Sequence, residues 1–368
     1  DRDLLMSARS QQLNLSSGSS PLTPTTVTIN PTTKFEDDPD AEPISTGANV
    51  YFPSPKNGYF SVREYYVDNN TLSTDASDIT GHVPRYVPDG YLEGISVGSV
   101  DMLVYRTTGD PDALYVYKYF WVGNDKPQSA WMQWTFDGTI VGMQADNTIL
   151  YLTVLRGSGA STEVSLEKIE LDNITTGDLG FRVCLDRLTS LSGSYSAVTG
   201  ETTWTLPYDE DPDDLIFVSS DDGLPIEVTD DSGTPTAAGD WSADDVYVGR
   251  PFTSTARMTE WYIRKEDNVA VTDARVRIRS LTLSFENSGP FKVEVTPSNR
   301  VPLTTEYTGI TMGVTSFGAP AITTGEFRFP VLANAKQTTV DIIAETYLPV
   351  FIMSGNLEGL YTSRAQII

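Results

Sequence analysis

The sequence has 368 residues and a formal net charge of −25, from 25 basic and 50 acidic side chains. A charge of this sign repels phosphate backbones, so tight binding of nucleic acid is disfavoured. Hydrophobic residues make up 39% and aromatic residues 10% of the chain, which excludes wholesale disorder, and the length predicts two or three domains.

The scarcity of cysteine and histidine excludes several kinds of chemistry. Cys184 is the single cysteine, so no disulfide can form within the chain, and a reducing site of assembly is expected. His82 is the single histidine, which disfavours a zinc site and a Ser-His-Asp triad. We therefore expect no catalytic residues, no cofactor and no bound metal, and we interpret His82 as a structural side chain in a loop.

The sequence contains no signal for a membrane. No apolar run reaches the ~18 residues of a membrane helix, and residues 1–15 lack the apolar core of a signal peptide. We expect neither a membrane-spanning segment nor an export signal. The chain starts with Asp1 in place of Met, so we expect a processed, truncated or partial chain.

The first part of the chain differs in composition from the rest. Residues 1–44 mix Ser, Thr, Pro and acidic residues, which predicts an irregular linker or loop with a short strand at Val27–Ile29. From Val50 onward, short runs of Tyr, Val, Phe and Trp alternate with Gly, Asn and Asp at the spacing of all-β proteins. No long segment has the apolar spacing of an amphipathic helix, so the expected fold class is all-β.

Residues 45–175 predict a meander of antiparallel hairpins. Ala113–Val122 is largely apolar or aromatic on both faces, as expected for a strand that is packed on both sides. The units Gly94–Phe136 and Gly138–Leu171 have the length of propeller blades, and Gly47–Asp68 is a third candidate. We therefore predict a partial β-propeller whose remaining blades would lie upstream.

The second half of the chain divides into an acidic stretch and a strand-rich one. Residues 201–249 hold fourteen acidic side chains and neither Lys nor Arg, so residues 176–255 are predicted to be an acidic, loop-rich β insert. Residues 256–368 are predicted to be an antiparallel, β-sandwich-like domain. Its expected strands are Met258–Lys265, Asp273–Phe285, Phe291–Thr296, Glu326–Leu332, Thr338–Ile343 and Val350–Ser354.

Eight aspartates of the acidic stretch are candidate functional residues because they cluster beside Gly and Pro. They could ligate calcium or form solvated acidic loops, and the second is favoured because no cluster has the Gly and Glu positions of an EF-hand loop. The eight are Asp209, Asp211, Asp213, Asp214, Asp221, Asp222, Asp230 and Asp231.

Arg275, Arg277 and Arg279 alternate with apolar residues, so they share one face of a predicted strand. They could line a track for the phosphates of DNA, or pair with carboxylates on a neighbouring strand or subunit. The acidic net charge favours pairing. After Arg279 the apolar residues switch parity, which predicts a β-bulge near Ser280.

Seven segments are informative together because of their order along the chain. They are Tyr59–Tyr65, Asp78–Tyr86, Ala113–Tyr119, Gln128–Phe136, Val248–Ser254, Asn287–Val295 and Leu357–Ala365. In this order they resemble tail tubular protein B, the tail nozzle protein of short-tailed, podovirus-type bacteriophages. The sequence departs from that family in having Leu357 where Trp is common, and in lacking a counterpart of the family's N-terminal half.

The resemblance implies a structural component of a phage tail nozzle, which is a homohexameric conduit that guides the genome out and closes the tail before infection. It implies propeller domains outside a central channel, with residues 176–255 as the nozzle tip. The eight aspartates would then line the lumen or tip, and the three arginines would form salt bridges between subunits. Expected partners are further copies of the chain, the ring of tail tubular protein A, tail fibres, and genomic DNA that passes without sequence-specific binding. The expected location is the virion tail, after assembly in the host cytoplasm.

Two alternatives to a structural, non-enzymatic role stay open. One is a tail-associated polysaccharide hydrolase that uses two carboxylates, although fifty acidic residues leave the choice of a pair undetermined. The other is a carbohydrate-binding β-protein that stacks sugars on Trp131 and Trp134, although packing of these side chains in the core is favoured.

Overall fold

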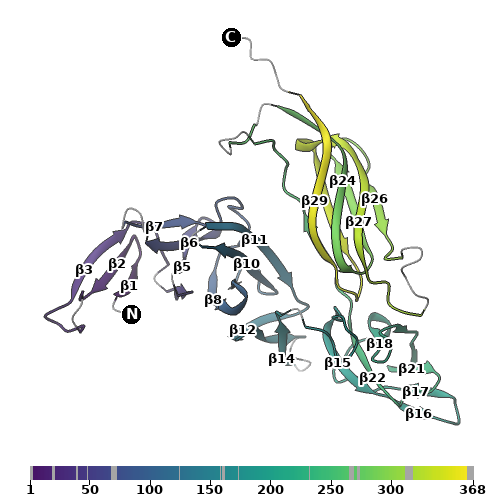
Figure 1. The fold of residues 1–368 in the computed structure, drawn as a ribbon. Helices are drawn as coiled ribbons and strands as arrows, with labels where there is room; N and C mark the ends of the chain where they lie inside the picture. The colour runs from purple at the N-terminus through teal and green to yellow at the C-terminus, as the bar shows by residue number, and fades with distance from the viewer. Residues whose placement is uncertain are drawn as a thin grey trace. The chain divides into compact units, whose positions relative to one another are not determined.

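The computed structural model describes residues 3–18, 21–38, 40–47, 49–67, 73–123, 125–157, 159, 162–172, 174–231, 233–264, 269–271, 274–310 and 318–362. Within these ranges the regular structure consists of antiparallel strands and a few single-turn 3-10 helices, which confirms the all-β prediction. No helix of the described part is long and apolar enough to cross a membrane. The chain divides into two compact units, Asp1–Asp172 and Asn173–Ile368 (Figure 1).

The first unit is built from antiparallel sheets in which each strand pairs with the next one along the chain. The first sheet contains β1 (Asp3–Ala8), β2 (Gln11–Ser16) and β3 (Thr28–Thr33). The second contains β4 (Ile44–Ser45), β5 (Val50–Lys56), β6 (Tyr59–Val67) and β7 (Thr74–Asp78). The third contains β8 (Tyr91–Val97), β9 (Met102–Thr107), β10 (Ala113–Val122) and β11 (Asp125–Thr135), with η1 (Gly98–Val100) before β9. The fourth contains β12 (Thr139–Asp146), β13 (Ile149–Arg156) and β14 (Glu163–Glu170).

The third sheet is packed on both faces, as predicted for Ala113–Val122. Tyr115 and Tyr117 of β10 enter a core cluster with residues of the second sheet, such as Phe60. Leu114 and Val116 of the same strand enter another cluster with residues of the fourth sheet. The first strands of successive sheets are also neighbours, because β4 contacts β8 and β8 contacts β12. The second, third and fourth sheets therefore form a stack.

A buried ion pair joins the second and third sheets. Glu64 of β6 accepts hydrogen bonds from the Tyr51 hydroxyl at 2.5 Å and from Asn49 Nδ2 at 2.9 Å, and it forms a salt bridge with Lys126 of β11. Lys126 Nζ also lies 5.0 Å from the centre of the Trp121 ring. Burial, followed by the hydrogen bond to Glu64 and then by the charge of Glu64, raises the pKa of Tyr51. The carboxylate is thus neutralised by a partner from another sheet.

Residues 1–44 were predicted to be an irregular linker with one short strand, but they contain the three strands of the first sheet. These strands lack apolar alternation, and hydrogen bonds between polar side chains stabilise the sheet instead. The buried side chain of Gln12 accepts a hydrogen bond from Thr33 Oγ1 at 2.6 Å and donates one to the carbonyl oxygen of Phe35 at 3.2 Å. Such contacts leave no hydrophobic pattern in the sequence.

Asp37, just after the first sheet, is a buried carboxyl. Its side chain is 2% exposed, and its oxygens accept no hydrogen bond from the described residues. Burial raises the pKa of Asp37 from 3.8 to about 7. Folding therefore favours the protonated acid.

The second unit begins with two facing sheets, and the stretch 201–249 is more regular than predicted. One sheet contains β15 (Asp186–Ser192), β22 (Asp245–Arg250), β18 (Ile216–Ser219) and β19 (Pro225–Ile226). The other contains β16 (Ser194–Ser196), β17 (Glu201–Thr203), β21 (Thr234–Ala238) and β20 (Thr229–Asp231), with η3 (Pro212–Asp214) before β18. Trp204, Phe217 and Val248 pack in one core cluster, and this cluster organises strands too short to be recognised from their sequence.

A two-sheet sandwich completes the second unit. One sheet contains β23 (Ser254–Arg257), β28 (Thr338–Ala344), β25 (Phe291–Pro297) and β26 (Leu303–Tyr307). The other contains β27 (Thr323–Asn334), β24 (Arg275–Ser288) and β29 (Phe351–Thr362), with η4 (Ala335–Gln337) after β27. Phe285 and Leu283 of β24 meet Phe291 and Val293 of β25 in the core.

Three details of this sandwich correct the predictions. The strand expected at Met258–Lys265 is not formed over residues 258–264, and Lys265 lies outside the described residues. The strand of this region, β23, precedes the expected range and ends at Arg257, after which Met258 and Trp261 pack against the core. β26 was not predicted. β29 continues for eight residues beyond the expected end at Ser354.

We predict that replacing Lys126 by Met lowers the free energy of unfolding of the first unit by about 3–5 kcal/mol, because it leaves Glu64 buried without its cation. The measurement is chemical denaturation of the full chain, followed by tryptophan fluorescence. The double variant Lys126→Met/Glu64→Gln is the control, and it should recover most of the loss. Equal destabilisation of both variants would contradict the ion pair as the cause.

We predict that Asp37 makes the stability of the first unit depend on pH. Because its folded pKa lies above the unfolded value, its contribution is fully present below pH 3.8 and is lost as the pH rises to about 7. The contribution falls by about 1.4 kcal/mol per pH unit in this window. Denaturation at a series of pH values checks it: Asp37→Asn should flatten the profile, whereas the exposed Asp112→Asn should leave it unchanged.

Candidate interaction surface

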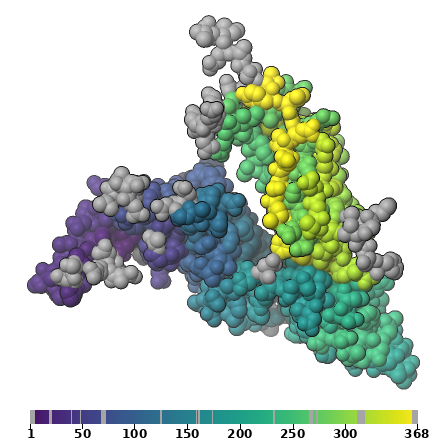
Figure 2. All heavy atoms as spheres, in the orientation of Figure 1, coloured from purple at the N-terminus to yellow at the C-terminus, as the bar shows by residue number. Residues whose placement is uncertain are grey.

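The sheet β27-β24-β29 has one face on the sandwich core and one exposed face. Arg275, Arg277 and Arg279 of β24 are exposed, while Ile278 between them is buried. This confirms the predicted alternation. β29, yellow in Figure 2, lies at the surface along its length. We call the exposed face the arginine face, defined by Arg275, Arg277, Arg279, Ser280, Arg328 and Glu358.

A bulge in β24 creates this face. The register shifts between Ile278 and Ser280 in the pairing with β27 and also in the pairing with β29, which confirms the predicted bulge. Beyond the shift, Leu281 and Leu283 are buried although they have the same parity as the arginines. The bulge therefore turns the strand from an arginine-lined surface to an apolar core.

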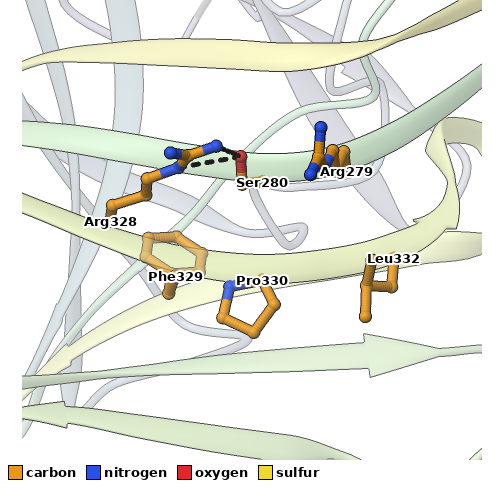
Figure 3. A pocket seen from close by; sticks show the side chains of 6 residues that line it. All are labelled: Arg279, Ser280, Arg328, Phe329, Pro330 and Leu332. Atoms are coloured by element: carbon orange, nitrogen blue, oxygen red, sulfur yellow. Dashed lines mark hydrogen bonds between the residues drawn. The ribbon is translucent and has the colours of Figure 1, made fainter.

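Glu358 of β29 binds side chains from both other strands. Glu358 Oε1 lies 3.4 Å from Arg279 Nη1, and Glu358 Oε2 forms a salt bridge with Arg328 of β27. Ser280 Oγ donates to Glu358 Oε2 at 3.1 Å and accepts from Arg328 Nη2 at 3.0 Å. Figure 3 shows Arg328 directed at Ser280, beside a shallow hollow that Pro330 and other residues line. One carboxylate thus fixes two of the four arginines of the face.

The other two arginines have no such partner. Arg275 and Arg277 are exposed and make no ion pair with a carboxylate of the described residues. Arg277 lies opposite Leu360 of β29, which is itself exposed. The three arginines predicted to form salt bridges therefore lie on one face of β24, and Arg279 forms its salt bridge with Glu358 of the same chain. Their role between subunits stays a prediction.

The predicted acidic residues lie in separate segments of the acidic stretch, including η3 and β20. Asp209, Asp211, Asp213, Asp214, Asp221, Asp222 and Asp230 are exposed, and the Asp231 side chain lies outside the described part. Three of them accept backbone hydrogen bonds that hold turns: Asp211 from Asp213 N at 3.1 Å, Asp222 from Leu224 N at 3.0 Å and Asp230 from Gly233 N at 2.6 Å. Within the described residues, no group of three or more His, Cys, Asp or Glu is arranged to hold a metal ion. Their place in a lumen or tip stays a prediction.

The other residues singled out in the sequence are His82, Trp131, Trp134 and Cys184, and their surroundings indicate structural roles. His82 is exposed in a turn, and Trp131 packs against the core while its Nε1 donates to the carbonyl oxygen of Ile79 at 3.0 Å. Trp134 packs on the other side of the third sheet. Burial raises the pKa of the Cys184 thiol, which favours the protonated form.

Two residues of the arginine face were absent from the predicted set. Arg328 and Glu358 stand 48 and 78 residues from Ser280 along the chain, so only strand register brings the three together. The sequence placed Arg328 within the predicted strand Glu326–Leu332, so its position on a sheet could have been recognised. It placed Glu358 outside any strand, because the expected strand ended at Ser354.

Comparison with known proteins gives a consistent family. A family model described as bacteriophage nozzle protein matches residues 1–368. The chain is 26% identical over 392 residues to tail tubular protein gp12 of Escherichia phage T7, covering 98% of this chain and 48% of that protein. The chain thus spans about half the length of this curated relative.

Similar solved structures are far more distant. A crystal structure of exo-beta-1,3-galactanase from Phanerochaete chrysosporium with galactose is 11% identical to this chain and has a TM-score of 0.21. The match covers 93% of this chain and 73% of the galactanase chain. A variant of the same enzyme with beta-1,3-galactotriose is 9% identical to this chain, also with a TM-score of 0.21. This match covers 86% of this chain and 95% of the galactanase chain. These scores are too low to indicate a shared fold.

We predict that Glu358→Gln lowers the free energy of unfolding by no more than about 1 kcal/mol, because both salt bridges of this carboxylate are exposed. Asp341→Asn is the comparison, since Asp341 is buried and accepts two hydrogen bonds of 2.8 Å from Arg257. It should cost more, about 1–3 kcal/mol. Chemical denaturation of the two variants checks the order, and a larger loss for Glu358→Gln would contradict it.

Proposed function

The chain belongs to the bacteriophage nozzle protein family and is a structural component of a phage tail, and on this premise we propose that it builds a homohexameric conduit for genome ejection. The conduit also closes the tail before infection. The observation that carries this proposal is the family match over all 368 residues. The proposed partners are further copies of the chain, the tail tubular protein A ring, tail fibres and DNA in transit.

The charge of the chain supports passage of DNA. A net charge of −25 leaves few places where phosphate groups could be retained. The acidic stretch 201–249 has no Lys or Arg. Seven of its eight candidate aspartates are exposed, and the side chain of the eighth, Asp231, lies outside the described part. We propose that this stretch lines the lumen or tip and lowers the retention of DNA.

The stacked sheets of the first unit support a propeller arrangement. Propeller blades are antiparallel meanders that pack face to face around an axis. The second, third and fourth sheets share both features, and their first strands β4, β8 and β12 are successive neighbours. We propose that they are blades of a β-propeller, to which residues 45–175 contribute.

We propose that the protein has no enzymatic activity. Three aspartates of the acidic stretch support turns, the single histidine is exposed, and the candidate sugar-stacking Trp131 and Trp134 pack against cores. Nothing in this arrangement favours the hydrolase alternative over a structural role.

We predict that the purified chain forms a ring with six-fold symmetry in negative-stain images. Mass photometry should give a particle about six times the 40.3 kDa of one chain. The reason is that ring-forming contacts between different patches close only at a fixed number of copies.

A glycan-release assay on host surface polysaccharide serves as the control for the enzymatic alternative, and it should give no product above background. A monomer that binds or cleaves glycan would overturn the proposed function.

A further inference from the structure

One edge strand of the sandwich in the second unit lacks several of the usual protections, because it is long and contains no Pro, Lys or Arg. An exposed strand edge carries unpaired backbone groups, and proteins blunt such edges with short strands, Pro, Lys or other charges. β23 and β26 have four and five residues, and β27 contains Pro330, Arg328 and Glu326. β29 has twelve residues and contains no Pro, Lys or Arg, and among the described strands it pairs only with β24.

The side chains of β29 are unusual for a surface facing water. Met353 is 65% exposed and Leu360 is 70% exposed, and Tyr361 is also exposed. The one charged residue of the strand, Glu358, is already paired with arginines. A long edge with exposed apolar side chains of this kind favours addition of another strand.

The charges beside the edge indicate what occupies it. Arg275 and Arg277 are exposed next to Leu360 and are unpaired among the described residues, and Arg combined with apolar side chains is typical of protein interfaces. A face for DNA phosphates would lack the exposed apolar side chains of the neighbouring strand. A second copy of this chain, with its net charge of −25, supplies many carboxylates for the two arginines.

We propose that β29 and the arginine face form the contact between neighbouring copies of the chain, in which β29 extends a sheet across the interface and Arg275 and Arg277 pair with carboxylates of the next copy. This inference rests on the proposed ring. The contact is head-to-tail, because a patch that pairs with itself gives only dimers, whereas a ring needs two different patches.

The test compares two matched double variants of the full chain. Met353→Lys/Leu360→Lys puts charges on the exposed edge, and Val198→Lys/Val301→Lys makes the same change at residues that are 97% and 87% exposed elsewhere in the second unit. Mass photometry should show that the first variant falls to the mass of a single chain while the control keeps the mass of the assembly. Unchanged thermal midpoints of both variants would show that folding is intact.

Hydrogen exchange tests the strand addition itself. Amides of residues 351–362 should exchange at least tenfold more slowly in the assembled wild type than in the dissociated edge variant. Equal rates would overturn strand addition.

The remaining outcomes separate this inference from the proposed function. If the edge variant still forms a six-fold ring, the ring stands and the β29 contact is wrong. If the wild type is itself a single chain, both are wrong. If Arg275→Gln/Arg277→Gln leaves the mass unchanged but weakens binding of duplex DNA measured by fluorescence anisotropy, the face is a phosphate track and this inference is overturned.

Discussion

The one-residue bulge at Ile278–Ser280 is the constraint on which the surface of the C-terminal sandwich depends. Side chains of a strand alternate between two faces, and Arg275, Arg277 and Arg279 have the same parity as Leu281, Leu283 and Phe285. A regular strand would therefore bury the arginines or expose the apolar residues. The bulge resolves this conflict inside β24, so that a single strand contributes to a cationic surface at one end and to the core at the other.

Features that belong to one strand were predictable from the sequence, and features that depend on register were not. The bounds of β10, its two apolar faces and the β24 bulge follow from alternation along a single segment. The first sheet was missed because the polar side chain of Gln12 holds it. Glu358 was missed because the neighbouring Gly355, Asn356 and Gly359 are typical of a turn, although this segment pairs with β24 as part of β29. The acidic residues were recognised, but whether they face a lumen is a property of an assembly.

The two carboxylate clusters of this protein serve different purposes because they differ in burial. Glu64 is enclosed with Lys126 and Tyr51, so the desolvated carboxylate depends on these partners and the two sheets are held in one arrangement. Glu358 is exposed, and its pairs with Arg279 and Arg328 contribute little to stability. An exposed pair can exchange partners at low cost, which suits a surface that meets another molecule. A buried pair cannot.

The net negative charge of the chain has two effects, because it opposes association of the copies and it disfavours retention of DNA. Copies that each carry a net charge of −25 repel one another, so their association requires a local patch where the sign is reversed. The same charge, under the proposed function, keeps a passing duplex from being retained. A protein with both properties needs cations that are available at the contacts between copies, and solvated carboxylates along the path of the duplex. The arginine face has this character, because its arginines lie beside exposed apolar side chains that gain by being covered, whereas the described aspartates of the acidic stretch are exposed to solvent. Burial of apolar area can then drive association that charge alone would oppose.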